Sequence, residues 1–268
     1  MGSLKLDACT RRGVALEVKK DVGPAYFLSD LHLGAYPEGE KTSIPMLMDF
    51  LAHVESQRAS LYIVGDLLDF WFEYRSVVPR GPFRLLARFK AMVENGCEVT
   101  YIAGNHDHWL GDFLKNDVGL AIHRDLVDTT IEGKRFFISH GDGIATTGDL
   151  GYRVLKGVLH SPITMAAFRL IHPDVGIGLA RLFSRMSRRK SSQNHAEPDL
   201  DDFVKGRGRK GYDYVILGHL HRPKLFDVDQ TTCMVVGDWI QCFTYGLFAE
   251  GKLTLNKWPE KAQPAPNS

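Results

Sequence analysis

Five short apolar segments, each followed by an acidic, imidazole or amide side chain, constrain the fold of this chain more than any other feature. In chain order they read YFLSDLHLG, LYIVGDLLDFW, VTYIAGNHDHW, RFFISHGDG and YVILGHLHRP. Each apolar run has the length of a buried strand, and the glycines and polar residues after it favour turns. The expected strands are 25–28, 61–64, 99–103, 135–139 and 214–217.

Two helices are expected between the first three strands, over residues 44–55 and 83–94. The apolar residues of the first fall on one face at helical spacing: Leu47, Phe50, Leu51 and Val54. The second ends at Asn95-Gly96, a common helix stop. The alternation of strand and helix predicts an α/β fold.

The composition excludes some classes of protein. With 268 residues, 44% of them hydrophobic, the chain can form one large domain or two small ones. The formal net charge of +1 provides no overall field for nucleic acid, and no apolar run is long enough to span a membrane. We expect a protein that is soluble or lies on a membrane surface. It should have one domain over residues 1–257, a helical insertion at about 148–210 and a disordered tail at 258–268.

The polar residues at the strand ends form a candidate metal site, because ligands of α/β sheets bind beyond the carboxyl ends of strands. Asp30 and His32 share one side of an extended segment. The side chains that can meet them follow the other strands: Asp66, Asn105, His140, His219 and His221. Such oxygen and nitrogen donors suit Mn(II), Fe(II) or Zn(II) better than Mg(II) or Ca(II). They are too many for one ion and would serve two divalent ions bridged by a carboxylate. We expect Mn(II), with Fe(II) and Zn(II) as alternatives.

Turn preference alone can produce an isolated Asp-x-His after a strand, but it does not account for the whole ordered series. The blocks SDLHLG, GDLLDFW, GNHDHW, SHGDG and GHLHRP resemble the calcineurin-like metallophosphoesterase superfamily, over roughly residues 26–255 outside the insertion. The resemblance implies a β-sandwich of two mixed sheets flanked by helices. It also implies two ligand sets that share Asp66: Asp30, His32, Asp66 and His221 for one ion, and Asp66, Asn105, His140 and His219 for the other.

Two residues of the GNHD block are candidates for catalysis. We expect His106 to handle the leaving group or to stabilise charge in the transition state, because an imidazole can donate a proton near neutral pH. Asp107 either orients that imidazole or has a purely structural role, and the sequence leaves both interpretations open.

A narrower resemblance rests on GDLLDFW, on SHGDG followed by DLGY, on GHLHRP and on the late VGDW. These motifs are similar to those of the bacterial UDP-2,3-diacylglucosamine diphosphatases of lipid A biosynthesis. The resemblance implies metal-dependent hydrolysis of UDP-2,3-diacylglucosamine to UMP and 2,3-diacylglucosamine 1-phosphate. It also implies a glycolipid nucleotide substrate and a peripheral position on the cytoplasmic face of the bacterial inner membrane. No nucleic-acid partner or obligate protein partner is expected.

The insertion agrees with such a substrate, because residues 157–190 alternate leucine and phenylalanine with arginine. Arginine binds phosphate in bidentate fashion, and a basic amphipathic helix lies well on an anionic membrane. The alternative is that these helices only cap the sandwich. The resemblance implies substrate contacts at Asp149 and Tyr152 of DLGY. The other expected contacts are Arg185 and Arg188, together with Asn105 and His219 of the metal site.

One position departs from the narrower family. The best-studied branch has GNRD, whose arginine helps to hold the pyrophosphate, whereas this chain has GNHD with His106. The alternative function is therefore a general metal-dependent phosphodiesterase or nucleotide pyrophosphatase for an unacylated substrate, which would leave the insertion only a structural role. A nuclease is expected to have a basic groove, which the net charge of +1 does not favour. A non-catalytic scaffold is expected to have lost metal ligands, whereas all seven are present in this chain.

Overall fold

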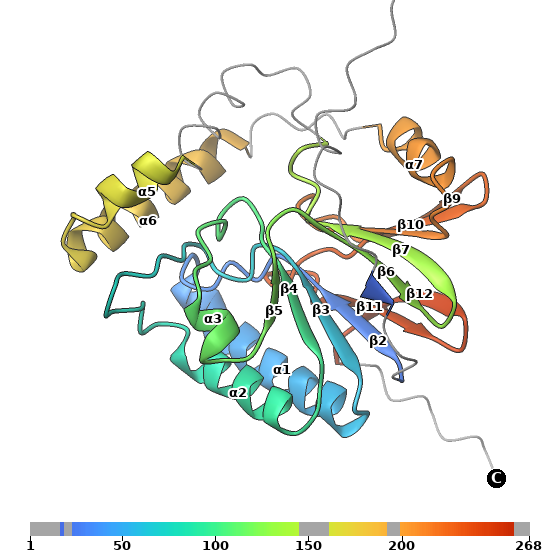
Figure 1. Cartoon of the computed structure of the whole chain (residues 1–268), viewed down its shortest axis with the longest axis horizontal. Helices are drawn as coiled ribbons and strands as arrows, with labels where there is room; N and C mark the ends of the chain where they lie inside the picture. The colour runs from blue at the N-terminus through green and yellow to red at the C-terminus, as the bar shows by residue number, and fades with distance from the viewer. Residues whose placement is uncertain (1–16, 19–22, 145–160, 192–198, 260–268) are drawn as a thin grey trace, which may run out of the picture.

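Two mixed six-stranded sheets pack face to face in the computed structural model, with helices on both outer faces (Figure 1). The structure describes residues 17–18, 23–144, 161–191 and 199–259. The first sheet has the strand order β12 (Lys252–Lys257), β11 (Thr244–Ala249), β2 (Ala25–Leu28), β3 (Ser60–Val64), β4 (Val99–Ile102) and β5 (Ala121–His123). The second has the order β1 (Glu17–Val18), β6 (Leu126–Ile131), β7 (Lys134–Ser139), β8 (Tyr214–Leu217), β10 (Thr231–Val235) and β9 (Lys224–Val228). The expected α/β sandwich of two mixed sheets is confirmed.

The strands that carry the polar motifs are the parallel ones. In the first sheet β2, β3, β4 and β5 run parallel, and in the second β7, β8 and β10 do. Strands β2 and β8 have the expected bounds, and the other three expected strands agree within one residue at each end. Parallel strands covered on both faces read as continuous apolar runs, which is why the sequence located them well.

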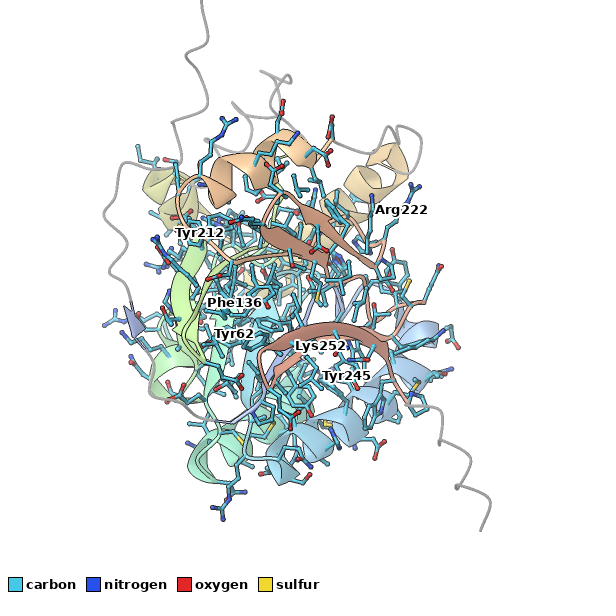
Figure 2. All side chains as sticks on the ribbon, turned by 90° about the vertical axis from the view of Figure 1, so that its right-hand side faces the viewer. Tyr62, Phe136, Tyr212, Arg222, Tyr245 and Lys252 are labelled. Atoms are coloured by element: carbon cyan, nitrogen blue, oxygen red, sulfur yellow. The ribbon has the colours of Figure 1, made fainter. Side chains whose placement is uncertain are left out.

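Aromatic rings fill the space between the two sheets. Phe27 of β2 stacks on Tyr62 of β3 with ring centroids 5.2 Å apart, and on Phe136 of β7 at 6.0 Å. Figure 2 shows Tyr62 and Phe136 in the middle of the molecule, and both belong to the core cluster between the sheets. The neighbours of Phe27, Tyr26 and Leu28, point to the opposite face, where they pack beneath helices.

Helices α1 (Pro37–Ser56) and α2 (Phe83–Glu94) cover the outer face of the first sheet, and the short α3 (Phe113–Asn116) packs in the same core cluster (Figure 1). Helix α2 has the expected bounds. Helix α1 begins seven residues before the expected start, at Pro37, because its first two turns are polar and carry no apolar periodicity. Proline is favoured at the first helical position, and the acidic Glu38 and Glu40 suit the positive end of the helix dipole.

The segment expected as an insertion contains helices of two kinds. Helices α5 (Pro162–Phe168) and α6 (Pro173–Ser191) project from the body, whereas α7 (Asp201–Gly208) covers the outer face of the second sheet (Figure 1). Val204 of α7 is buried together with Val215 of β8 and Cys233 of β10. Helix α7 therefore completes the sandwich, and the projecting part is α5 with α6, which we call the helical arm.

The tail expected from residue 258 starts with a packed side chain. Trp258 contacts the rings of Phe50 and Tyr245, and its backbone N–H donates to the Phe243 carbonyl at 2.8 Å. Residues 260–268 lie outside the described part of the chain. Among the described residues, no helix combines the length and the apolar character needed to cross a bilayer.

Replacement of Phe27 by alanine should destabilise the protein strongly. The side chain is fully buried between the sheets, so Phe27→Ala should lower the free energy of unfolding by about 3–5 kcal/mol. The control is Val77→Ala in an exposed loop, which should change it by less than about 0.5 kcal/mol. Urea titration of both variants measures the difference, and equal shifts would contradict the role of the intersheet core.

Candidate metal centre and active site

The polar residues that follow the parallel strands of both sheets meet at one edge of the sandwich. The backbone N–H of His219, after β8, donates to Asp30 Oδ2, after β2, at 2.8 Å. The Trp239 N–H, after β10, donates to the Asp30 carbonyl at 3.1 Å. These bonds join the two sheets at the carboxyl ends of their strands, where α/β proteins bind ligands.

Five of the expected ligands have a left-handed backbone. Their φ values are 55° at Asp30, 46° at His32, 50° at Asp66, 68° at His219 and 55° at His221. This conformation costs a residue other than glycine roughly 1–2 kcal/mol. Local hydrogen bonds hold it, for example from His32 N–H to the Asp66 carbonyl at 2.9 Å. The strained turns direct several side chains from successive strands to the same place.

Asp30, His32 and His221 form the first group of donors. Asp30 Oδ1 lies 3.6 Å from His32 Nε2 and 3.4 Å from His221 Nε2, and the two ring nitrogens are 3.3 Å apart. Asp30 Oδ1 is buried and has no hydrogen-bond partner among the described residues. A buried carboxylate oxygen that faces two imidazole nitrogens at these distances fits a divalent cation better than a set of hydrogen bonds.

Asp66, Asn105, His140 and His219 form the second group. His140 Nε2 lies 3.2 Å from Asp66 Oδ2 and 3.1 Å from Asn105 Oδ1, and a ring nitrogen of His219 lies within 4.8 Å of the Asp66 and His140 ligand atoms. His140 Nδ1 contacts the Val64 carbonyl at 2.9 Å, which assigns a proton to Nδ1 and directs Nε2 into the group. The donor set again fits a divalent ion.

Asp66 lies between the two groups. Its Oδ2 is 3.2 Å from His140 Nε2 and 3.7 Å from His32 Nε2, while its Oδ1 accepts from the His106 N–H at 2.9 Å. The structure thus brings all seven expected ligands together. It also brings ligand atoms of His106, His32 and Asp66 within 4.8 Å of one another.

Burial and neighbouring charges shift the pKa values of the ionisable groups in the cluster in different directions. Burial alone would raise the pKa of Asp66, but His140, His32 and His106 bring it well below its ordinary value. Burial would lower the pKa of His140, yet the Asp66 and Asp30 carboxylates raise it to about 10. Burial and the neighbouring His140 lower the pKa of His219 to about 4. A metal needs a deprotonated ligand atom. The Nε2 proton of His140 therefore has to leave on metal binding, while the Nδ1 proton keeps its hydrogen bond to the Val64 carbonyl.

The structure separates the two candidates for catalysis. Asp107 is fully buried, and its carboxylate accepts from the Gly104 N–H at 2.7 Å, from the Leu68 N–H at 3.2 Å and from the Tyr101 hydroxyl. These bonds hold the turn after β4, in agreement with the structural interpretation of Asp107 that the sequence left open. The carboxylate beside the His106 imidazole is that of Asp69, with Oδ1 at 3.5 Å from Nδ1.

Three residues near the site carry no assignment from the sequence. Asp69 and Ser184 lie at His106 Nδ1. Asp238 accepts three backbone N–H groups in the turn after β10, and its Oδ2 is 3.5 Å from His221 Nδ1. Burial raises the pKa of Asp238, but His221 and these N–H groups bring it down to about 2. VGDW repeats the glycine-aspartate pattern after a strand and could have indicated Asp238. Ser184 lies on a helix and has no such signal.

The expected substrate contacts are only partly described. Asn105 and His219 lie in the donor groups. Arg185 and Arg188 lie on α6, but their side chains are outside what the structure describes. Asp149 and Tyr152 fall in residues 145–160, which are also outside it.

Aromatic rings attach the helical arm to the body beside the site. Phe168 of α5 packs against Phe72 at 4.7 Å and Trp109 at 5.1 Å between ring centroids. A cavity of about 240 Å³ lies between α6 and the body, lined mostly by apolar side chains and by Asp69 and Glu40. The arm therefore lies directly beside the residues around His106.

The family model described as calcineurin-like phosphoesterase matches residues 23–223. The chain belongs to this family, whose members are metal-dependent hydrolases of phosphoesters. The family implies divalent metal ions, and the Asp and His groups above are candidate sites for them.

Individual relatives carry the name of one particular hydrolase. A protein of Porphyromonas gingivalis named UDP-2,3-diacylglucosamine hydrolase is 30% identical over 252 residues, which cover 86% of this chain and 95% of the relative. A protein of the same name from Neisseria meningitidis serogroup B is 27% identical over 220 residues, covering 81% and 90%. Among solved structures, an archaeal phosphodiesterase has 15% identity and a TM-score of 0.47, over 87% of this chain and 98% of that one.

A methyl group at Gly104 should weaken metal binding. A Cβ there would overlap the Asp66 carboxylate and lie 2.5 Å from the Asp66 backbone nitrogen, so Gly104→Ala should displace Asp66. We expect metal affinity to fall by about 10- to 100-fold, as measured by calorimetric titration with Mn(II). Gly206→Ala on α7 is the control, since a Cβ there meets nothing within 4 Å. Unchanged affinity in Gly104→Ala would contradict the place of Asp66 in the site.

Proposed function

We propose that this protein hydrolyses the pyrophosphate of UDP-2,3-diacylglucosamine and releases UMP and 2,3-diacylglucosamine 1-phosphate, a step of lipid A biosynthesis. The observation that carries the proposal is the convergence of two donor groups on Asp66 beside an arm with exposed apolar side chains. Relatives that carry the name of this activity, at 25–30% identity over most of the chain, support it.

The proposal includes two divalent ions, most simply Mn(II), with Fe(II) and Zn(II) as alternatives. Asp30, His32 and His221 would hold one ion, and Asn105, His140 and His219 the other, with Asp66 shared. Bound ions of this kind polarise a phosphoryl oxygen and lower the pKa of water, which makes hydrolysis feasible at neutral pH. The orphaned Asp30 Oδ1 supports this assignment.

His106 is proposed as the proton donor. Hydrolysis forms one phosphorus–oxygen bond to water and breaks one to the bridging oxygen, and a proton from His106 would neutralise the charge that develops on that oxygen. His106 contacts Asp69 and Ser184 through Nδ1, which assigns the transfer to the opposite nitrogen, Nε2. The imidazole stands edge-on to His32, with ring centroids 4.8 Å apart, and so lies at the donor groups.

The helical arm is proposed to bind the acyl chains and the membrane surface. It exposes large apolar side chains, among them Ile163 at 80%, Leu170 at 89% and Leu182 at 54% of their surface. Burying each of them against lipid would contribute about 1.5–3 kcal/mol. Together with the substrate's location in a bilayer, this supports a peripheral position on the cytoplasmic face of a bacterial inner membrane. We also propose that residues 1–257 form one domain that includes the arm.

Loss of the shared carboxylate should remove both the ions and the activity. Asp66→Ala should lower turnover by about 10³-fold or more, because several kcal/mol of charge stabilisation depend on the ions. Elemental analysis of purified protein should show the loss of bound metal. Asp227→Ala, an exposed carboxylate on β9, is the control. Wild-type metal content and turnover in Asp66→Ala would refute the shared role.

The substrate class can be tested directly. Purified protein with Mn(II) should cleave UDP-2,3-diacylglucosamine much faster than UDP-N-acetylglucosamine or a bis-aryl phosphodiester, because the arm binds the acyl chains. Release of UMP, measured by chromatography, is the readout, and Asn105→Ala is the inactive control. Equal or faster cleavage of the unacylated compounds would reject the lipid substrate and favour a general phosphodiesterase.

A further inference from the structure

Ser184 connects the helical arm to the proposed proton donor. Its hydroxyl, on α6, donates to Asp69 Oδ1 at 2.6 Å and lies 3.1 Å from His106 Nδ1. The direct distance from Asp69 Oδ1 to His106 Nδ1 is 3.5 Å, too long for a good hydrogen bond. The hydroxyl therefore bridges a carboxylate and an imidazole that do not bond well to each other.

The chemistry of the three groups determines the direction of the bridge. An ionised carboxylate only accepts, so the serine hydrogen points to Asp69. The serine oxygen then accepts from His106, which assigns a proton to Nδ1. Asp69 is only 3% exposed and His106 14%, so water competes little for these bonds. The chain from Nδ1–H through Oγ–H to the carboxylate keeps a proton on Nδ1 and fixes the rotation of the imidazole, so that the protonated ring donates from Nε2.

The geometry excludes Ser184 as a nucleophile activated by His106. In a Ser-His-Asp triad the serine and the carboxylate lie at opposite ring nitrogens, so that one holds the imidazole while the other loses its proton. Here both lie at Nδ1. Ser184 can orient the imidazole, but it cannot pass a proton across it.

Ser184 reaches this position only because α6 is seated on the body. At its start, α6 packs through the buried Gly176, where an added Cβ would lie 2.5 Å from the Tyr74 hydroxyl and 3.0 Å from Phe168. Ser184 follows eight residues later, about 12 Å along the helix. The helix thus contacts the body at an aromatic anchor and again at the active site.

We propose that Ser184 is a positioning residue for His106, and that it makes proton transfer depend on the seating of α6. This inference rests on the proposed role of His106 as proton donor, and it gives helix α6 of the arm a part in that role through Ser184. Substrate that binds the arm stabilises the seated helix and, through Ser184, the productive imidazole. Binding energy from a remote part of the substrate then raises kcat rather than only lowering KM.

The test compares Ser184→Ala with Ser184→Thr, which keeps the hydroxyl. Two UMP esters differ only in the leaving group: a p-nitrophenyl ester, which needs little protonation, and a phenyl ester, which needs much more. Ser184→Ala should lower kcat for the phenyl ester by up to about 100-fold, with KM little changed, and should affect the p-nitrophenyl ester far less. Ser184→Thr should restore most of the loss. Leu225→Ala, an exposed change on β9 away from the arm, should match the wild type on both esters.

A double-mutant comparison adds a second readout. If Ser184 acts through Asp69, then Asp69→Asn and Ser184→Ala together should slow the phenyl ester hardly more than either alone. Independent, multiplying losses would overturn the bridge. So would equal losses on both esters, or a fall in metal content or thermal stability that accounts for the loss.

Both esters lack acyl chains, so the test does not depend on the lipid substrate. Failure to cleave UDP-2,3-diacylglucosamine would reject the proposed function while the leaving-group comparison still reports on Ser184. Equal kcat of Ser184→Ala and wild type on the phenyl ester would reject the inference alone.

Discussion

The carboxylate of Asp30 joins the two halves of this molecule. One sheet supplies the residue itself, and the other supplies the His219 N–H to its side chain and the Trp239 N–H to its carbonyl. Ser29 Oγ donates to the same Oδ2 and to the Val64 carbonyl, which ties in the next strand as well. The remaining oxygen, Oδ1, faces two imidazoles from different sheets. The site therefore exists only while the sheets keep their mutual position, and the aromatic core between them serves that purpose.

Such a site is costly to the fold. Asp30 and Asp66 are almost fully buried, and burial disfavours their charged forms. Five of the expected ligands, these two carboxylates included, have strained backbone angles. The imidazoles around the carboxylates offset part of the cost by lowering their pKa values, and a bound divalent cation would offset more. Strain and buried charge at one edge of a well-packed sandwich are typical of a functional site.

The helical arm joins the sandwich beside the residues around His106. Helix α7 completes the sandwich, whereas α5 and α6 attach through aromatic rings and lie beside a cavity and the His106 imidazole. The GNHD block places the His106 imidazole at the edge of the site. That imidazole contacts Asp69 and the arm through Ser184. In the proposed function, a single serine hydroxyl therefore links the arm that binds substrate to the imidazole that donates a proton.

The sequence by itself predicted the five motif strands, helix α2 and the convergence of the seven candidate ligands at one edge of the sandwich. Apolar runs and turn residues are local signals, and the ends of parallel strands converge in any α/β sheet.

Tertiary structure decided the rest. The Asp107 carboxylate accepts hydrogen bonds from the backbone N–H groups of Gly104 and Leu68. These contacts exist only in the folded chain, so the sequence could not reveal them. Helix α1 starts in a polar stretch that periodicity does not mark, and α7 belongs to the sandwich because the second sheet has an apolar outer face to cover. Asp69 and Ser184 are 115 residues apart, and no local pattern relates a serine on a helix to an aspartate after a strand. Their contact depends on how the arm packs on the body, which is a property of the folded chain alone.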